Sequence, residues 1–105
     1  MKFLIWAKPS ATMEPPQEQM TTLLRGFADS IRTQLSNHQL DCAYATGAQA
    51  GFGIADAASV EEVWERVYAN PMAPFWDVEV TALADCIATA GIQIRAIEAM
   101  QATPA

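Results

Sequence analysis

Hydrophobic residues are spaced in two different ways along the chain, and each spacing predicts a different kind of element. Residues 2–7 are almost continuously apolar and end before Lys8-Pro9, which is typical of a short buried strand. From about residue 17 to residue 37, apolar residues instead recur every three or four positions, as on one face of a helix. These positions are Met20, Leu23, Leu24, Phe27, Ile31 and Leu35. We therefore expect a strand, a proline-containing loop and a long amphipathic helix, with His38 near the helix end.

The middle of the chain predicts a hairpin followed by a second helix. Two short apolar runs, 40–46 and 50–56, flank the small residues Gly47-Ala48-Gln49, which permit a tight turn or a bulge. Ser59 followed by Glu62 fits a capping box at a helix start. The expected inward stripe of this helix is Val60, Val63, Trp64, Val67 and Tyr68. Asn70-Pro71 and Pro74 end the helix.

Strict alternation over residues 76–83 predicts a fourth strand. The element order is then strand, helix, strand, strand, helix, strand. This order predicts an α+β domain with ferredoxin-like βαββαβ topology, in which a four-stranded antiparallel sheet carries both helices on one face. We place this domain at residues 1–84.

Residues 85–105 form a C-terminal extension with its own apolar pattern. Ile87, Ala90, Ile94, Ile97 and Met100 fall near one helical face, whereas the alternation of Ile92 and Ile94 also permits a strand. A helix is the favoured interpretation. Because the segment is too apolar for a solvated tail, we expect it to pack on its own or a neighbouring subunit. The uncovered sheet face likewise predicts a homo-oligomer, a dimer or larger.

The net charge of the chain and the length of its apolar segments argue against several classes of partner. Twelve Asp and Glu against six scattered Lys and Arg give a net charge of -6, which disfavours nucleic acid and anionic membrane surfaces. The run Gly51-Phe52-Gly53-Ile54-Ala55 is similar to the core of the RNA-recognition motif, but Ala50 and Ile54 replace the basic and stacking residues that RNA binding needs. No segment approaches the roughly 20 apolar residues of a membrane span. We expect a cytoplasmic protein.

The sequence offers few residues for a metal or a cofactor. Its two cysteines, Cys42 and Cys86, lie far apart and are expected to be reduced, small buried residues. With the single histidine His38 and no phosphate-binding glycine loop, we expect neither an intrinsic metal nor an organic cofactor.

The stretch from Gly47 to Leu83 resembles the muconolactone isomerase family of the dimeric α/β-barrel superfamily. The similar positions are Gly47, Ile54, Asp56, Ser59, Glu62, Pro71, Pro74 and the last strand, Asp77-Val78-Glu79-Val80-Thr81-Ala82-Leu83. This resemblance implies a dimeric α/β barrel and a cofactor-independent enzyme. Its substrate would be a small hydrophobic carbonyl, lactone or aromatic compound, and its reaction a proton transfer. The alternative is a non-catalytic oligomeric module of the same fold that binds a small ligand or a partner.

Glu79 is the leading candidate for the acid or base. If Val78 and Val80 face the helices, alternation turns Glu79 and Thr81 to the opposite face, toward the space between subunits. There Glu79 would transfer protons, although a solvated or ion-paired carboxylate is the simpler alternative.

Tyr44 and Lys8 are the candidates for polarising a substrate oxygen. Leu4, Trp6, Tyr44 and Thr81 are the expected ligand-binding residues, because aromatic rings with one polar atom suit a flat organic ligand. Trp6 is also compatible with a purely structural core position.

Overall fold

The computed structural model describes residues 1–102, apart from the side chain of Ala48. The strands are β1 (Lys2–Pro9), β2 (Leu40–Ala45), β3 (Gly51–Asp56) and β4 (Trp76–Leu83). The α-helices are α1 (Met20–Ser36), α2 (Val60–Ala69) and α3 (Cys86–Ala102), and three short 3₁₀ turns are η1 (Gln17–Gln19), η2 (Gly47–Gln49) and η3 (Ala73–Phe75). The predicted βαββαβ order is confirmed, and the C-terminal extension is a helix through residue 102.

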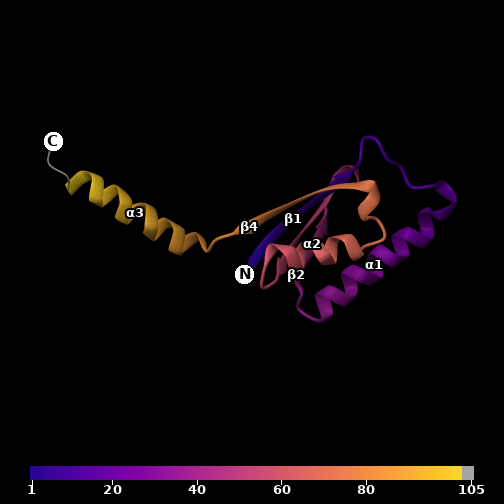
Figure 1. Ribbon diagram of the computed structural model, residues 1–105, viewed down its shortest axis with the longest axis horizontal. Helices are drawn as coiled ribbons and strands as arrows, with labels where there is room; N and C mark the ends of the chain where they lie inside the picture. Colours follow the sequence, from indigo (N-terminus) through magenta and orange to yellow (C-terminus); the bar gives the residue numbers. More distant parts are fainter. Residues whose placement is uncertain (103–105) are drawn as a thin grey trace.

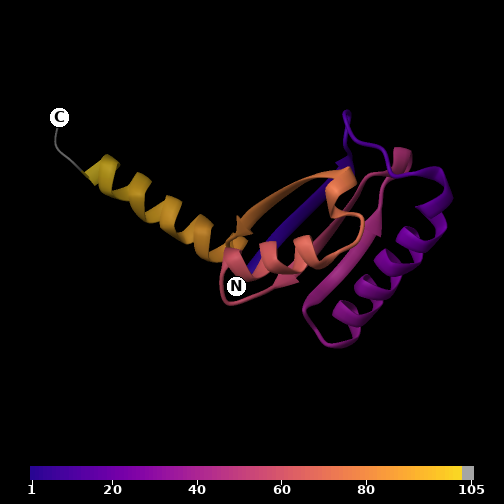
Figure 2. The ribbon, with the colours of Figure 1, turned by 45° about the vertical axis from the view of Figure 1, so that its right-hand side comes forward.

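The four strands form one antiparallel sheet in the order β2-β3-β1-β4. Helices α1 and α2 cover one face of this sheet, and no element of the described chain covers the other (Figures 1 and 2). The predicted ferredoxin-like α+β fold, with both helices on one face, is therefore confirmed. We call the uncovered side the open face.

The core lies between the helices and the centre of the sheet. Phe3 of β1 and Val63 of α2 are the largest fully buried side chains, at 1% and 0% exposure. The buried apolar residues are Phe3, Leu40, Ala55, Ala57, Val63 and Met72. Helix α1 adds only the partly buried Ile31 to this cluster. Phe3 lies directly opposite Ala82 and Ala55 in the neighbouring strands, so odd-numbered residues of β1 face the helices.

The start of α2 has the predicted capping box. The Ser59 hydroxyl accepts a hydrogen bond from the Glu62 N–H at 3.3 Å. In return the Glu62 carboxylate accepts from the Ala58 N–H at 2.9 Å, one residue earlier than the usual partner. This N–H, together with the Arg66 guanidinium 2.8 Å away, lowers the pKa of Glu62.

Two details differ from the sequence prediction. Strand β1 continues through Lys8 to Pro9, because these two residues pair only with β4 and the missing proline N–H is not needed by β3. The prediction that Val60 and Tyr68 belong to the inward face of α2 is wrong, because these side chains are 38% and 75% exposed. Val63 and Val67 suffice to cover the sheet, so the ridge that includes Tyr68 turns outward. As expected, His38 lies near the end of α1, two residues after Ser36, with φ at 65°.

Helix α3 extends away from the α/β domain, in the direction in which β4 leaves the sheet (Figures 1 and 2). It lengthens the molecule to 69 × 31 × 24 Å and raises the radius of gyration to 18.6 Å. A compact chain of this length has a radius of gyration of about 13 Å. The expected packing of the extension on its own subunit is absent from the described residues. Its packing on a neighbouring subunit stays a prediction, and residues 103–105 lie outside the described residues.

Candidate functional site

The open face carries the predicted site residues in cross-strand rows. Tyr44 of β2 lies opposite Phe52 of β3, Phe52 opposite Trp6 of β1, and Trp6 opposite Glu79 of β4. The next row places Ile54, Leu4 and Thr81 side by side on β3, β1 and β4. Five predicted site residues therefore lie together on the open face. They are Tyr44, Trp6, Glu79, Leu4 and Thr81.

Three aromatic rings form a platform across this surface. Trp6 and Phe52 are nearly parallel, with centroids 6.3 Å apart and an interplanar angle of 13°. Tyr44 and Phe52 are tilted, with centroids 5.8 Å apart. We call Tyr44, Phe52 and Trp6 the aromatic platform. A flat organic molecule gains apolar contact on such a surface, and the Tyr44 hydroxyl adds one polar group.

Glu79 borders the aromatic platform on the β4 side. Val78 and Val80 are partly buried toward the helices, and Glu79 between them is exposed on the open face. Lys8 lies opposite Asp77, two residues before Glu79 on the same face, so Lys8 and Glu79 are diagonal neighbours. Diagonal positions have Cβ atoms about 7–8 Å apart, which long side chains can span. A carboxylate and an ammonium group thus border one ring surface.

Tyr44 is separated from Glu79 within one chain. It lies on the outer strand β2, whereas Glu79 lies on the opposite outer strand β4. Three strand spacings of about 4.8 Å put their backbones roughly 14 Å apart. A small molecule in contact with Glu79, Lys8 and Trp6 does not reach Tyr44 of the same chain.

An ionic cluster closes one end of the open face. The Lys2 ammonium lies 2.8 Å from the Asp41 carboxylate and 3.3 Å from that of Asp56. Hydrogen bonding to Asp41 raises the pKa of Lys2, and hydrogen bonding from Lys2 lowers the pKa of Asp56. All three side chains are close to half exposed. With the N-terminal ammonium 3.4 Å from Asp56, they balance charge at the rim and leave the centre of the face to aromatic and aliphatic groups.

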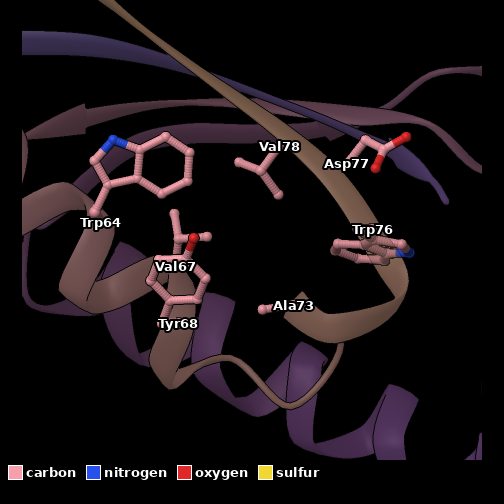
Figure 3. A pocket seen from close by; sticks show the side chains of 7 residues that line it. All are labelled: Trp64, Val67, Tyr68, Ala73, Trp76, Asp77 and Val78. Carbon is pink, nitrogen blue, oxygen red and sulfur yellow. The ribbon is translucent and has the colours of Figure 1, made fainter. Parts of the chain in front are cut away.

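Two hollows of the described chain lie beside the helices and not on the open face. A groove of about 220 Å³ runs between α2 and β4, and its lining includes Trp64, Tyr68 and Trp76 (Figure 3). A wider depression separates α1 from α2 near Gly26 and Arg66. On the open face, in contrast, Glu79, Thr81, Tyr44 and Lys8 are exposed. A site on that face needs a cover to exclude water.

Two further observations concern metals and membranes. No group of three or more His, Cys, Asp or Glu among residues 1–102 is arranged to hold a metal ion. The expectation that no metal or cofactor is intrinsic stays a prediction. Within the same residues, no helix combines the length and apolar character needed to cross a membrane.

Phe52 and Ile54 belong to the open face and were not among the predicted ligand-contacting residues. Their alternation with Gly51, Gly53 and Ala55 was the available signal, because only one side of β3 carries large side chains. The two glycines form the helix-facing side of β3, where a Cβ on Gly53 would lie 3.0 Å from the Cys42 carbonyl oxygen.

Comparison with known proteins supports the predicted fold but does not identify a family or an activity. No family model matches the sequence, and no curated protein matches it closely enough to count. A solved structure of muconolactone isomerase superimposes with a TM-score of 0.69 at 20% identity, covering 81% of this chain and 90% of that one. A 5-chloro-2-hydroxyhydroquinone dehydrochlorinase from Burkholderia phenoliruptrix AC1100, in complex with 2,5-dihydroxybenzoquinone, gives a TM-score of 0.56 at 18% identity. It covers 80% of this chain and 94% of that one.

The share of this chain that the similarity covers can be compared in length with its α/β part. Since 81% of 105 residues is about 85, the similarity to muconolactone isomerase is as long as the α/β domain without α3. The resemblance inferred from the sequence is thus confirmed at the level of architecture. The chain has the fold of muconolactone isomerase.

Proposed function

We propose that the protein is a cofactor-independent enzyme that transfers protons on a small hydrophobic carbonyl, lactone or aromatic compound. The observation that carries this proposal is the row in which Glu79 borders the aromatic platform, with Lys8 diagonal to it. The two similar structures support the substrate class, because their names specify a lactone and a hydroxylated ring.

Each group has a role in this chemistry. The ring or lactone lies on Trp6 and Phe52, with Leu4 and Thr81 at its edge. The Glu79 carboxylate takes a proton from a carbon next to the carbonyl, and the Lys8 ammonium stabilises the negative charge that develops on the carbonyl oxygen. Return of the proton to a different carbon isomerises the substrate. The reaction consumes no oxidant or reductant.

A second copy completes the site in this proposal. If two open faces meet about a twofold axis parallel to the strands, β2 of one copy lies over β4 of the other. The row from Tyr44 to Glu79 in one copy then lies over the same row of the other copy, in the reverse order. Tyr44 of each copy is thereby brought toward Glu79 of the other. This arrangement removes the roughly 14 Å separation within one chain and excludes water from the platform.

Replacement of Glu79 by glutamine tests the proposal. Glu79→Gln keeps the shape and removes the acid–base group, so we expect proton exchange to fall about 10²–10⁴-fold. The measurement is exchange of hydrogen for deuterium at the carbon next to the carbonyl, followed by NMR over a panel of lactones and hydroxyquinones. Because the side chain is exposed in the single chain, the melting temperature should stay nearly unchanged.

Asp77→Asn is the matched control. Asp77 is exposed on the same strand and face, opposite Lys8, yet it lies one row away from Trp6. The control should retain exchange. Equal exchange by Glu79→Gln and wild type would contradict the catalytic role, and binding without any exchange would identify the non-catalytic ligand-binding module of the same fold.

A further inference from the structure

Helix α3 has an apolar surface that its own chain leaves uncovered. None of its residues is buried, and its large apolar side chains are exposed between 53% and 84%. Gly91 and four isoleucines lower its intrinsic helix propensity. The Asp85 carboxylate accepts from the Ala88 N–H at 2.7 Å and caps the helix start, but this cap covers no apolar surface. Since most helical stability in proteins comes from packing of an apolar face, α3 needs a second element against it.

Four apolar side chains of α3 follow one narrow line along the helix. Ile87, Ala90, Ile94 and Ile97 are three, four and three residues apart, and Gln101 is the next position of this spacing. At 100° per residue, these five positions fall within about 80° of one another. A helix that packs on a sheet has a wider apolar stripe, whereas this spacing is typical of the seam between two helices. We call the five residues the α3 seam.

The α3 seam is uncharged and can therefore face a copy of itself. The charged residues of α3 are Arg95 and Glu98. They lie about 120° and 60° from the centre of the seam, so two seams in contact bring no like charges together. Ile92 lies on the opposite side of the helix, about 180° from the seam, and stays exposed when two helices pair.

Pairing of the open faces brings both α3 helices out at the same end of a dimer. A twofold axis parallel to the strands leaves the strand direction unchanged, and β4 is an outer strand, one and a half strand spacings from the centre of the sheet. With strands about 4.8 Å apart and sheets about 10 Å apart, the two β4 ends lie roughly 18 Å from each other. Each α3 continues in the direction in which β4 leaves (Figures 1 and 2). The two helices are then parallel neighbours, and Ala84 and Asp85 allow them to approach to the about 8–10 Å of packed helices.

We propose that α3 is a dimerisation helix, which pairs in parallel with α3 of a second copy through the α3 seam. The orientation rests on the pairing of open faces given under the proposed function, and it does not depend on catalysis. The seam is only about two heptads long, too short for a coiled coil on its own. The open-face contact compensates for this length, because it holds the two helices at a high effective concentration.

The areas of the two contacts support a combined interface. A sheet face four strands wide and about six residues long has a footprint on the order of 380 Å² per copy. One third of the surface of a helix about 25 Å long and 10 Å wide adds on the order of 250 Å². Two copies together give on the order of 1,300 Å², whereas neither contact alone reaches the roughly 1,200 Å² of a specific stable interface.

Two isoleucine variants of the full-length protein test the seam. Ile94 in the seam and Ile92 on the opposite side are 55% and 58% exposed in the single chain, so they differ in direction rather than in exposure. Ile94→Lys should raise the dissociation constant of the dimer at least about tenfold, because both copies lose a buried side chain. Ile92→Lys should leave the constant within about twofold of wild type. Sedimentation over a concentration series measures both.

Disulfide trapping tests the parallel orientation. In a background with Cys42 and Cys86 replaced by alanine, Gln101→Cys places a thiol in the seam near the helix end. Equivalent seam residues face each other in a parallel pair, so mild oxidation should give a covalent dimer. Ala99→Cys, about 160° away around the helix, is the matched control and should give at least about tenfold less.

The outcomes separate the helix pair from the pairing of open faces. Equal dissociation by both isoleucine variants, no dissociation by Ile94→Lys, or equal or absent trapping by the two cysteine variants would overturn the helix pair. A wild-type dimer that Phe52→Lys dissociates and Ile94→Lys does not would leave the open-face pairing intact. A dimer that Ile94→Lys dissociates and Phe52→Lys leaves intact would exclude the open-face pairing, and with it the parallel orientation.

Discussion

At the scale of single side chains, Arg66 connects three segments of the fold. Its guanidinium donates to the carbonyl oxygens of Asp56 at 2.8 Å and Gln39 at 3.2 Å, and it pairs with Glu62 at 2.8 Å. Only 14% of the side chain is exposed. Arg66 therefore attaches α2 to the ends of β2 and β3 with charge-assisted hydrogen bonds.

Replacement of Arg66 by methionine should cost about 1.5–3 kcal/mol of unfolding free energy, because two backbone oxygens lose a charged donor. Urea unfolding at pH 7 measures this loss. Arg32→Met is the control, since its pair with Asp29 at 2.7 Å is 74% exposed on both sides. It should cost less than about 1 kcal/mol. Equal losses in both variants would show that Arg66 acts only as exposed surface charge.

Glu62 should make stability depend on acidity. The Ala58 N–H and Arg66 lower its pKa in the folded protein, so the ionised form stabilises the fold at neutral pH. This contribution is fully present above the pKa of the unfolded chain, about 4.3, and is lost as the pH falls through the lower folded value. Glu62→Gln should therefore be less stable than wild type at pH 7, with a difference that shrinks below about pH 4. Urea midpoints across pH measure it, with exposed Glu65→Gln as control.

At the scale of secondary structure, one side of β3 carries only the small residues Gly51, Gly53 and Ala55. This side sets how closely β2 can approach β3. A Cβ on Gly53 would lie 3.0 Å from the Cys42 carbonyl oxygen and 3.4 Å from Leu40. Gly53 itself is buried, opposite Ala43 and Ile5 in the two neighbouring strands. The contact with a backbone oxygen leaves little room for adjustment.

Gly53→Ala should therefore destabilise the protein by about 1–3 kcal/mol, the usual cost of overpacking. Gly47→Ala is the matched control, because a Cβ there meets nothing within 4 Å and no glycine of the described residues has positive φ. Its melting temperature should stay near that of wild type. If Gly53→Ala and Gly47→Ala had the same melting temperature, β2 would move away from β3 without a loss of stability.

For the molecule as a whole, the buried core is small and two large apolar surfaces are exposed. Helix α1 has no fully buried residue. The open face presents the aromatic platform, and α3 exposes its isoleucine and methionine side chains. Such surfaces mark interaction sites. We expect a homo-oligomer in which the open faces meet.

Light scattering at micromolar concentration should give at least twice the mass of one 11.4 kDa chain. Phe52→Lys places a charge at the centre of the open face and should lower that mass, while the fold stays intact because Phe52 points away from the helices. Leu24→Lys, at a 44% exposed position on α1, is the control and should leave the mass unchanged. A monomeric wild-type protein would exclude the pairing of open faces.

Local periodicity was sufficient to predict the fold and the face on which Glu79 lies. The alternation of Val78, Glu79 and Val80 is a property of the strand itself, and the Ser59–Glu62 capping box needs only four consecutive residues. Such short-range patterns depend on backbone geometry alone, so they can be recognised without knowing which strands become neighbours.

Neighbour relations across the sheet required the folded chain. The order β2-β3-β1-β4 puts Lys8 near Glu79 and Tyr44 on the opposite outer strand, a separation that no spacing in the sequence reveals. The same is true of α2, where Val60 and Tyr68 have the spacing of buried residues and nevertheless line an exposed ridge. Strand order and helix rotation depend on the packing of residues far apart in the chain, and only the tertiary structure contains those contacts.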